Sequence, residues 1–223
     1  MAERLVSCNM AQNAVRLQPV TSGTSIMASD VIQATLAPPA AGRPRLRAVL
    51  LRRFLFPLYC RCTSWNRSMA VFRAEGLKSL QLAQSLTPDA FRTRVLIRPL
   101  WGLEDSARDW SAEMVFEHLI EAGAQIATTV VELSHGRRPL EDITTVTPSG
   151  GQGLEVLQDF RAFLDDYADT LREDVGDRNS KGTHPHPRLG DLAARQWICL
   201  GAQHQAVHRR QLEAIATVLY ARR

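Results

Sequence analysis

Apolar residues recur at helical spacing between Asp109 and Ser134, and this stripe constrains the fold more than any other feature of the 223-residue sequence. On a helix, one face carries Val115, His118, Leu119, Ala122, Ile126, Val130 and Leu133. Either Asp109 or Ser111 can cap the start of this helix, and Gly136 follows its expected end. Because a helix with one apolar face must bury that face, the rest of the chain has to supply packing partners.

Three further amphipathic helices are predicted, over about residues 64–86, 152–174 and 191–221. Residues 87–91 add a short helical turn, and no stretch shows the alternation typical of a strand. Four helices with one-sided apolar stripes predict an all-α fold, a four-helix bundle with long connecting loops. The loops expected at 137–151 and 176–190 exceed the usual length of bundle connections, which indicates that they carry function or cover a bundle end.

The N-terminal region differs in composition from the rest of the chain. Residues 1–47 are rich in Ala, Ser, Thr, Pro and Arg and show no sustained period. We therefore expect an irregular N-terminal extension over 1–47, disordered or linker-like, followed by the four-helix bundle domain over 48–223. Three origins stay open for the extension: a disordered tail, an Arg-rich organelle presequence, or translated sequence upstream of a start near Met69.

The charge and hydropathy of the chain argue against nucleic-acid and membrane partners. Residues 1–75 contain ten arginines and three acidic residues, whereas residues 76–223 contain seventeen basic and twenty acidic residues. The expected bundle is therefore mildly acidic and lacks the excess of positive charge that binds phosphates. The most apolar stretch, residues 48–62, is interrupted by Arg52, Arg53 and Pro57, so we expect no membrane span.

The number and spacing of the cysteines indicate whether the protein occupies an oxidising or a reducing cellular compartment. Cys8, Cys60, Cys62 and Cys199 show no disulfide-framework spacing, and no second pair completes a zinc site with Cys60 and Cys62. Cys199 is expected to be a small buried residue of the last helix. This usage favours a reducing compartment, and we expect a cytoplasmic protein unless the N-terminus is an organelle presequence.

Two histidines, His204 and His208, stand one helical turn apart on the apolar face of the last predicted helix. His118 lies in the middle of the apolar stripe at 109–134, so three imidazoles can converge in the bundle core. Burying them without partners is costly, whereas one divalent cation satisfies a nitrogen of each. We therefore predict a metal site of His118, His204 and His208; three protein ligands with an open position are typical of catalytic sites.

The alternative is that these three histidines are ordinary core or surface residues, as most isolated pairs four residues apart on a helix are. Loop positions are expected for His184 and His186, with His186 at a turn that shapes the rim of the site. We expect His135 to interact with the carbonyl groups at a helix end.

Four further side chains are weaker candidates for the surroundings of the site. Trp101 and Trp110 can wall a substrate pocket, although packing in the core or at a rim is the more common role of such residues. Gln203 and Gln211 flank the two histidines of the last helix and would either hydrogen-bond the ligands or face solvent.

The segment DWSAEMVFEHLIEAG at 109–123, followed by HPRLGDLAARQWICLGAQHQAVHRRQL at 186–212, resembles the DinB/YfiT-like family. Members show a Trp-Ser opening and a His-Leu pair on the second helix, then an HPxxG turn, a Trp and a His-x₃-His on the last helix. The matching residues are Trp110-Ser111, His118-Leu119, His186-Pro187 through Gly190, Trp197, and His204 with His208. The similarity covers about residues 65–221 and leaves the N-terminal extension outside.

The resemblance implies an up-down-down-up four-helix bundle with a Zn, Ni, Mn or Fe ion on His118, His204 and His208. It also implies a metal-dependent enzyme, either a thiol-dependent S-transferase or a hydrolase, that acts on a small-molecule substrate and takes water or a low-molecular-weight thiol at the open position. The alternative is a non-catalytic DinB-like bundle that serves as a binding or stress-response module. Relatives often dimerise, so a homodimer is a further expectation. Neither the resemblance nor the residues assign a general acid or base.

Overall fold

The structure, a computed structural model, describes residues 54–139 and 147–221. Four long helices dominate this part of the chain: α4 (Trp65–Gln84), α6 (Ala112–Ser134), α7 (Val156–Glu173) and α8 (Ala194–Tyr220). The predicted four-helix bundle is thereby confirmed, with the four predicted helices at their expected places. The expected extension over 1–47 and the domain start at 48 lie outside the described residues.

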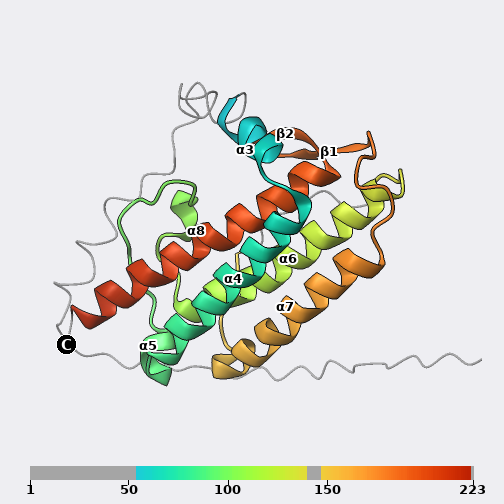
Figure 1. Ribbon diagram of the computed structural model, residues 1–223. Helices are drawn as coiled ribbons and strands as arrows, with labels where there is room; N and C mark the ends of the chain where they lie inside the picture. Colours follow the sequence, from blue (N-terminus) through green and yellow to red (C-terminus); the bar gives the residue numbers. More distant parts are fainter. Residues whose placement is uncertain (1–53, 140–146, 222–223) are drawn as a thin grey trace, which may run out of the picture. The chain divides into compact units, whose positions relative to one another are not determined.

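The long helices pack in a ring, with α4 against α8, α8 against α6, α6 against α7, and α7 against α4 (Figure 1). Figure 1 also shows that the pair α4 and α8 runs in the opposite direction to the pair α6 and α7. This is the up-down-down-up arrangement. It makes α4 and α8 parallel neighbours, as their contacts show: Ser68 lies beside Cys199 near the two starts, and Tyr220 donates a hydrogen bond to the Ser85 carbonyl near the two ends.

The parallel course of α6 and α7 explains the length of the connection between them. Near the helix starts, Glu113 of α6 accepts a hydrogen bond from the Gly151 backbone N–H (2.8 Å). Near the helix ends, Ser134 accepts one from the Gly176 backbone N–H (3.0 Å). The connection therefore joins opposite ends of the bundle, along a helix of 23 residues, which at about 1.5 Å per residue measures roughly 35 Å.

Local signals in the sequence set the ends of α6. Ser111 is its N-cap, and the Ser111 hydroxyl oxygen accepts a hydrogen bond from the Met114 backbone N–H (3.2 Å). Of the two predicted caps, Ser111 rather than Asp109 therefore holds this position. Gly136, with φ +71°, adopts the left-handed conformation that stops a helix, as predicted.

Short elements occupy the two ends of the bundle. α3 (Phe56–Cys62) precedes α4, and α5 (Pro88–Arg92) follows it as the predicted helical turn. The 3₁₀ turns η2 (Asp105–Ala107) and η3 (Gly153–Glu155) precede α6 and α7. None of the helices in the described part of the chain combines the length and apolar character that a bilayer crossing needs.

The expectation of a strand-free loop over 176–190 was wrong in part. β1 (Thr183–His186) and β2 (Gly190–Ala193) form an antiparallel hairpin in which His184 faces Leu192. Each strand buries only one side chain, so the alternation is too short to be recognised in the sequence. Because β2 uses residues 190–193, α8 begins at Ala194 and not near 191.

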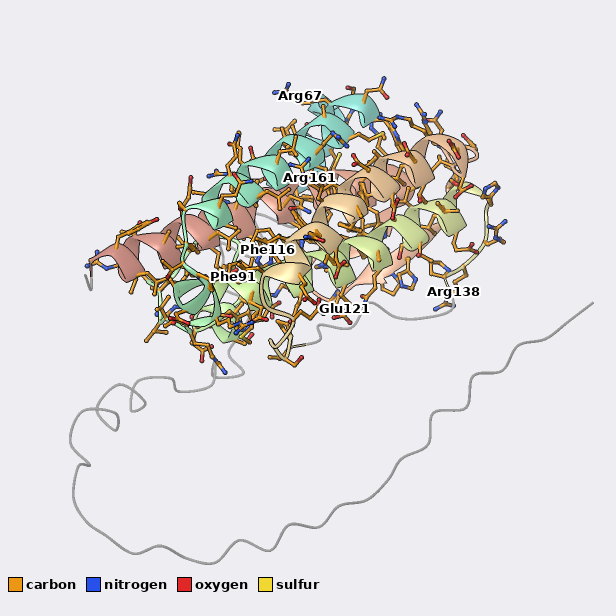
Figure 2. All side chains as sticks on the ribbon, turned by 90° about the horizontal axis from the view of Figure 1, so that it is seen from below. Arg67, Phe91, Phe116, Glu121, Arg138 and Arg161 are labelled. Carbon is orange, nitrogen blue, oxygen red and sulfur yellow. The ribbon has the colours of Figure 1, made fainter. Side chains whose placement is uncertain are left out.

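Aromatic residues fill the bundle interior. Phe91 of α5 and Phe116 of α6 lie side by side with ring centroids 5.9 Å apart (Figure 2), and Phe116 packs edge-on against Phe160 of α7 at 5.0 Å. Arg67 and Arg161, also labelled in Figure 2, are exposed. The apolar stripes therefore face inward, as a bundle requires.

We expect Gly201→Leu to destabilise the bundle by about 2 kcal/mol, because a core without space must shift to accept extra atoms. A Cβ at position 201 of α8 would lie 2.9 Å from the Tyr167 hydroxyl oxygen and 3.4 Å from Ile126 Cγ2. Tyr167 has little freedom to move, since its ring stacks on Phe72 with centroids 3.7 Å apart. Urea denaturation measures the loss.

Thr217→Leu is the matched control for Gly201→Leu, because Thr217 is exposed on the same helix. Its free energy of unfolding should change by no more than about 0.5 kcal/mol. A Gly201→Leu protein as stable as the unmodified chain would show that α8 does not need this close approach.

Candidate metal centre

Three histidine side chains meet between α6 and α8. His118 comes from the middle of α6, and His204 and His208 come from successive turns of α8. The Nε2 atoms of His118 and His204 are 3.1 Å apart, and one potential ligand atom from each of the three residues lies within 4.8 Å of the others. The structure therefore brings together the three residues singled out in the sequence, in a group that could hold a metal ion.

Gln211 fixes the orientation of the His208 ring. The Gln211 side-chain amide donates a hydrogen bond to the Ala107 carbonyl (2.6 Å), so its Oε1 is the atom that faces His208 Nδ1 at 2.7 Å. An amide oxygen can only accept, and therefore His208 carries a proton on Nδ1. The lone pair of neutral His208 is then on Nε2. Of the two predicted flanking glutamines, Gln211 contacts a histidine of the group; Gln203 lines the adjacent cavity.

Burial keeps the three imidazoles neutral. His118 is 8% exposed and His208 is 4% exposed. Desolvation lowers the pKa of His118 to about 4. Desolvation, followed by the proximity of His118, lowers the pKa of His208 to about 3. The pKa of His204 falls well below 6.5, again through desolvation first and then the neighbouring histidines. At neutral pH all three are in the form that binds cations.

The distances in the group suit a small divalent cation. Two nitrogens that bind the same tetrahedral zinc at about 2.0–2.1 Å lie roughly 3.3 Å apart. The separation between His118 Nε2 and His204 Nε2 is 3.1 Å. Without a cation, one of these two nitrogens must donate its proton to the other; a bound cation replaces that proton. The donor set is therefore compatible with zinc, nickel, manganese or iron.

Trp110 closes one side of the histidine group. Its ring stacks parallel to the His208 ring, with centroids 6.2 Å apart and planes 6° apart, and meets the His118 ring edge-on at 5.1 Å. Trp110 is buried, whereas Trp101 is 63% exposed. Both line a cavity next to the histidines. Trp110 also belongs to the hydrophobic core, as the more common role predicted, and exposed Trp101 lies at the cavity rim.

The other histidines have separate surroundings. His186, at the predicted rim position, lines the same cavity. His184 is buried on β1 with its ring 6.1 Å from that of Trp197, so the prediction of a free loop residue was wrong. His135 Nε2 lies 2.8 Å from the carbonyl oxygen of Asp174, the C-cap of α7. The predicted contact with carbonyls at a helix end is therefore present, but the carbonyl belongs to α7 and not to the helix that His135 itself ends.

The cavity above the histidines has a volume of about 430 Å³. Its walls come from five parts of the chain: α3 with the residue before it, the segment 101–110, α6, the β1–β2 hairpin with its turn, and α8. The contribution of Phe56 and Tyr59 from α3 was not predicted. The sequence shows only an apolar stretch there, with no partner to indicate which surface it covers.

Two acidic residues next to His118 serve the fold. Buried Glu113 accepts hydrogen bonds from the backbone N–H groups of Gly151 and Gly153, and Glu117 accepts one from Gly150 (2.9 Å). These carboxylates hold the start of α7 against α6, and they have no place in the histidine group. The sequence did not single them out, because the backbone partners lie more than thirty residues away.

Cys199 is buried, as predicted, and lies outside the histidine group. Its Sγ is 3.4 Å from the Ser68 hydroxyl oxygen, and Cys60 of α3 is buried nearby. A hydrogen bond from Cys60, helped by one from Ser68 and by the charge of Arg195, lowers the pKa of Cys199 to about 7.

Comparison with known proteins adds little to these observations. No family model matches the chain, and no curated protein matches it. A solved crystal structure, of TT2238, a four-helix bundle protein, is similar at 23% identity and a TM-score of 0.46, over 68% of this chain and 99% of that one. The four-helix architecture rests on the helix contacts described above and not on this likeness.

Proposed function

We propose that this chain is a metal-dependent enzyme of the DinB-like type, which holds one divalent ion on His118, His204 and His208. The observation that carries the proposal is the convergence of three neutral imidazoles, two buried and one half-buried, with no acidic partner in the group, at distances that suit a small cation. The family assignment rests on the order and spacing of the sequence motifs. Zinc, nickel, manganese and iron are the candidate ions.

The reaction class we propose is thiol-dependent S-transfer or hydrolysis on a small-molecule substrate. A divalent ion on three neutral ligands with an open position supplies Lewis-acid chemistry and stabilises the anionic form of a coordinating thiol or water. All three histidines line the 430 Å³ cavity, so the open position faces a space that can take a substrate. Trp110 packs against two of the rings, and Gln211 holds the His208 ring by a hydrogen bond.

Gln211→Leu tests the role of the His208 orientation. The change removes the acceptor for His208 Nδ1–H at nearly constant side-chain volume, so His208 can turn or change tautomer. We expect divalent-metal affinity to fall about 10- to 100-fold, the range typical for lost partners of metal ligands. Isothermal titration calorimetry with Zn²⁺ measures the fall. Gln203→Leu is the control, because Gln203 lines the cavity without a hydrogen bond to the histidines; an equal effect of both variants would contradict this role.

Elemental analysis of the purified chain tests metal binding itself. We expect about one divalent ion per chain, either as purified or after loading with each of the four candidate metals. The loaded protein is then incubated with glutathione, bacillithiol or mycothiol and a panel of electrophiles, followed by mass spectrometry of the products. Metal-dependent formation of a thiol conjugate, or metal-dependent hydrolysis in a parallel ester and amide panel, supports the enzyme.

Two results would overturn the proposal at different levels. A chain that binds none of the four metals stoichiometrically removes the metal centre and the enzyme together. A fully loaded chain that is silent toward both panels leaves a metal-binding bundle without the proposed activity, which is the non-catalytic alternative.

A further inference from the structure

The cavity beside the histidine group has mainly apolar and aromatic walls. Side chains on several sides of it are Trp101, Trp110, Leu189, Leu200 and Val207. A volume of about 430 Å³ falls within the range of small-molecule sites, in which apolar walls supply most of the binding free energy. The walls therefore favour a ligand with a sizeable apolar or aromatic body.

The cavity offers no unpaired charge to a ligand. Among the described residues, only two lining side chains carry a full charge, Glu104 and Arg188. They form an ion pair with each other at 2.9 Å. An ionised group that leaves water needs a countercharge, and here both charges are already used. The part of a ligand that lies away from the histidine group is therefore selected to be uncharged, and in the metal-free protein this holds for the whole cavity.

His186 contributes a hydrogen-bond donor to this cavity. Its Nδ1 accepts hydrogen bonds from the backbone N–H groups of Arg188 and Leu189, both at 3.2 Å. The neutral ring must then carry its proton on Nε2. This is the reverse of His208, whose protonated Nδ1 leaves a lone pair on Nε2. His186 is thus prepared to donate to a ligand and not to bind a cation.

Trp197 packs next to His186 on the same wall. Its side chain is fully buried and lines the cavity, and its indole N–H has no hydrogen-bond partner among the described residues. The His186 and Trp197 rings lie with centroids 5.6 Å apart. Since the indole N–H is itself closed off from the cavity space, the donor that a ligand can reach on this wall is His186 Nε2.

We propose that this cavity binds an uncharged, mainly apolar or aromatic molecule with a hydrogen-bond-accepting oxygen, which faces His186. If this molecule is the substrate of the enzyme, the proposal rests on the proposed function. The binding of such a molecule by the cavity does not itself need a metal ion. The reacting part of the molecule would lie toward the three histidines, and the apolar body toward Trp101 and Leu200.

Three naphthalenes of similar shape test the proposal on metal-free protein by isothermal titration calorimetry. These are 2-acetylnaphthalene, which is neutral with a carbonyl acceptor; 2-ethylnaphthalene, which is neutral without an acceptor; and 2-naphthoate, which is an anion. We expect the ketone to bind at least about tenfold more tightly than the anion, since the anion must be desolvated without a countercharge. Failure of both neutral probes to bind, or equal affinity of ketone and anion, would overturn the proposal.

His186→Asn isolates the donor. The Asn oxygen can accept from the backbone N–H groups of Arg188 and Leu189 in place of Nδ1, while the Nε2–H is lost. The affinity for 2-acetylnaphthalene should fall about fivefold, the effect of one hydrogen bond, and that for 2-ethylnaphthalene should stay within about twofold. An equal fall for both probes would show that His186 acts through shape alone and would contradict the donor role.

Leu200→Trp and Ala122→Phe fill the cavity from α8 and α6, and either should weaken both neutral probes at least about tenfold, since the apolar area they bury is lost. Leu154→Trp is the matched control on an exposed site outside the cavity, and helical circular dichroism confirms that each variant folds. Unchanged probe binding in both folded cavity variants would place the probes elsewhere and overturn the proposal. Metal content is measured separately on the same preparations. If the protein binds no metal but still binds 2-acetylnaphthalene more tightly than 2-naphthoate, the result contradicts the metal centre and not the cavity proposal.

Discussion

His204→Ala and His208→Ala should each abolish stoichiometric metal binding at neutral pH. Each change removes one of three imidazole nitrogens, and no carboxylate or thiol among the described residues stands in the group to replace it. Loss of a residue that hydrogen-bonds a metal ligand typically lowers metal affinity by up to about 100-fold. Here a ligand itself is lost, so the metal affinity should fall by more than that. Elemental analysis after dialysis against Zn²⁺, together with competition against a chromophoric chelator, measures the effect.

His118→Ala should weaken metal binding to a similar extent and leave the helical content unchanged, because the apolar faces of α4, α6, α7 and α8 remain in place. His135→Ala is the matched control: the same change at an exposed histidine at the end of α6 should not alter metal affinity. Full metal occupancy in either α8 variant would rule out the three-histidine centre. Global unfolding of His118→Ala by circular dichroism would show that this residue is mainly a packing element.

The helices and the histidine group could be predicted because both depend on local spacing. Apolar residues at three- and four-residue intervals place His118 on the buried face of one helix and His204 with His208 on the buried face of another. Two helices that share a core must bring these faces together. The resemblance to the DinB/YfiT-like motifs pointed to the same three residues, and the structure shows them within 4.8 Å.

What surrounds the histidines could not be predicted, because it depends on contacts between distant segments. The hydrogen bond from Gln211 to Ala107 spans 104 residues, and it decides which nitrogen of His208 is protonated. From the residue spacing alone, Gln211 could either hydrogen-bond a histidine or face solvent. The walls from α3 and from the hairpin are a similar case, since each is too short to show a period and acquires its position only from the surface it covers.

The same burial that keeps the histidines neutral should make the metal-free protein sensitive to mild acid. An imidazole in the unfolded chain has a pKa of about 6.5. In the folded chain, burial lowers the pKa of His118 to about 4 and that of His208 to about 3. As pH falls below about 6.5, the unfolded chain therefore takes up protons that the folded chain does not, and the free energy of unfolding decreases.

The pH range in which stability is lost distinguishes the contribution of these histidines from that of the carboxylates. At pH 5 each depressed histidine costs about 2 kcal/mol, so we expect the metal-free protein to lose at least about 3 kcal/mol between pH 7 and pH 5. His204, whose pKa is lowered well below 6.5, and His186, whose pKa is lowered to about 4 by burial and by Arg188, act in the same direction. Carboxylates with ordinary or lowered pKa values contribute mainly below pH 5.

Urea denaturation of metal-free protein at intervals between pH 5 and pH 7.5 measures this slope. His118→Gln combined with His208→Gln should make the slope shallower, because glutamine keeps a polar side chain of similar size and does not titrate, while His204 and His186 leave a residual slope. Saturating Zn²⁺ at pH 7 should add RT ln(1 + [Zn²⁺]/Kd) to the stability of the unmodified chain and nothing to the double variant, about 2.7 kcal/mol at a hundredfold excess over Kd. A slope in the double variant as steep as that of the unmodified chain would mean that the acid sensitivity has another origin, and that the His118 and His208 rings are not held neutral by burial.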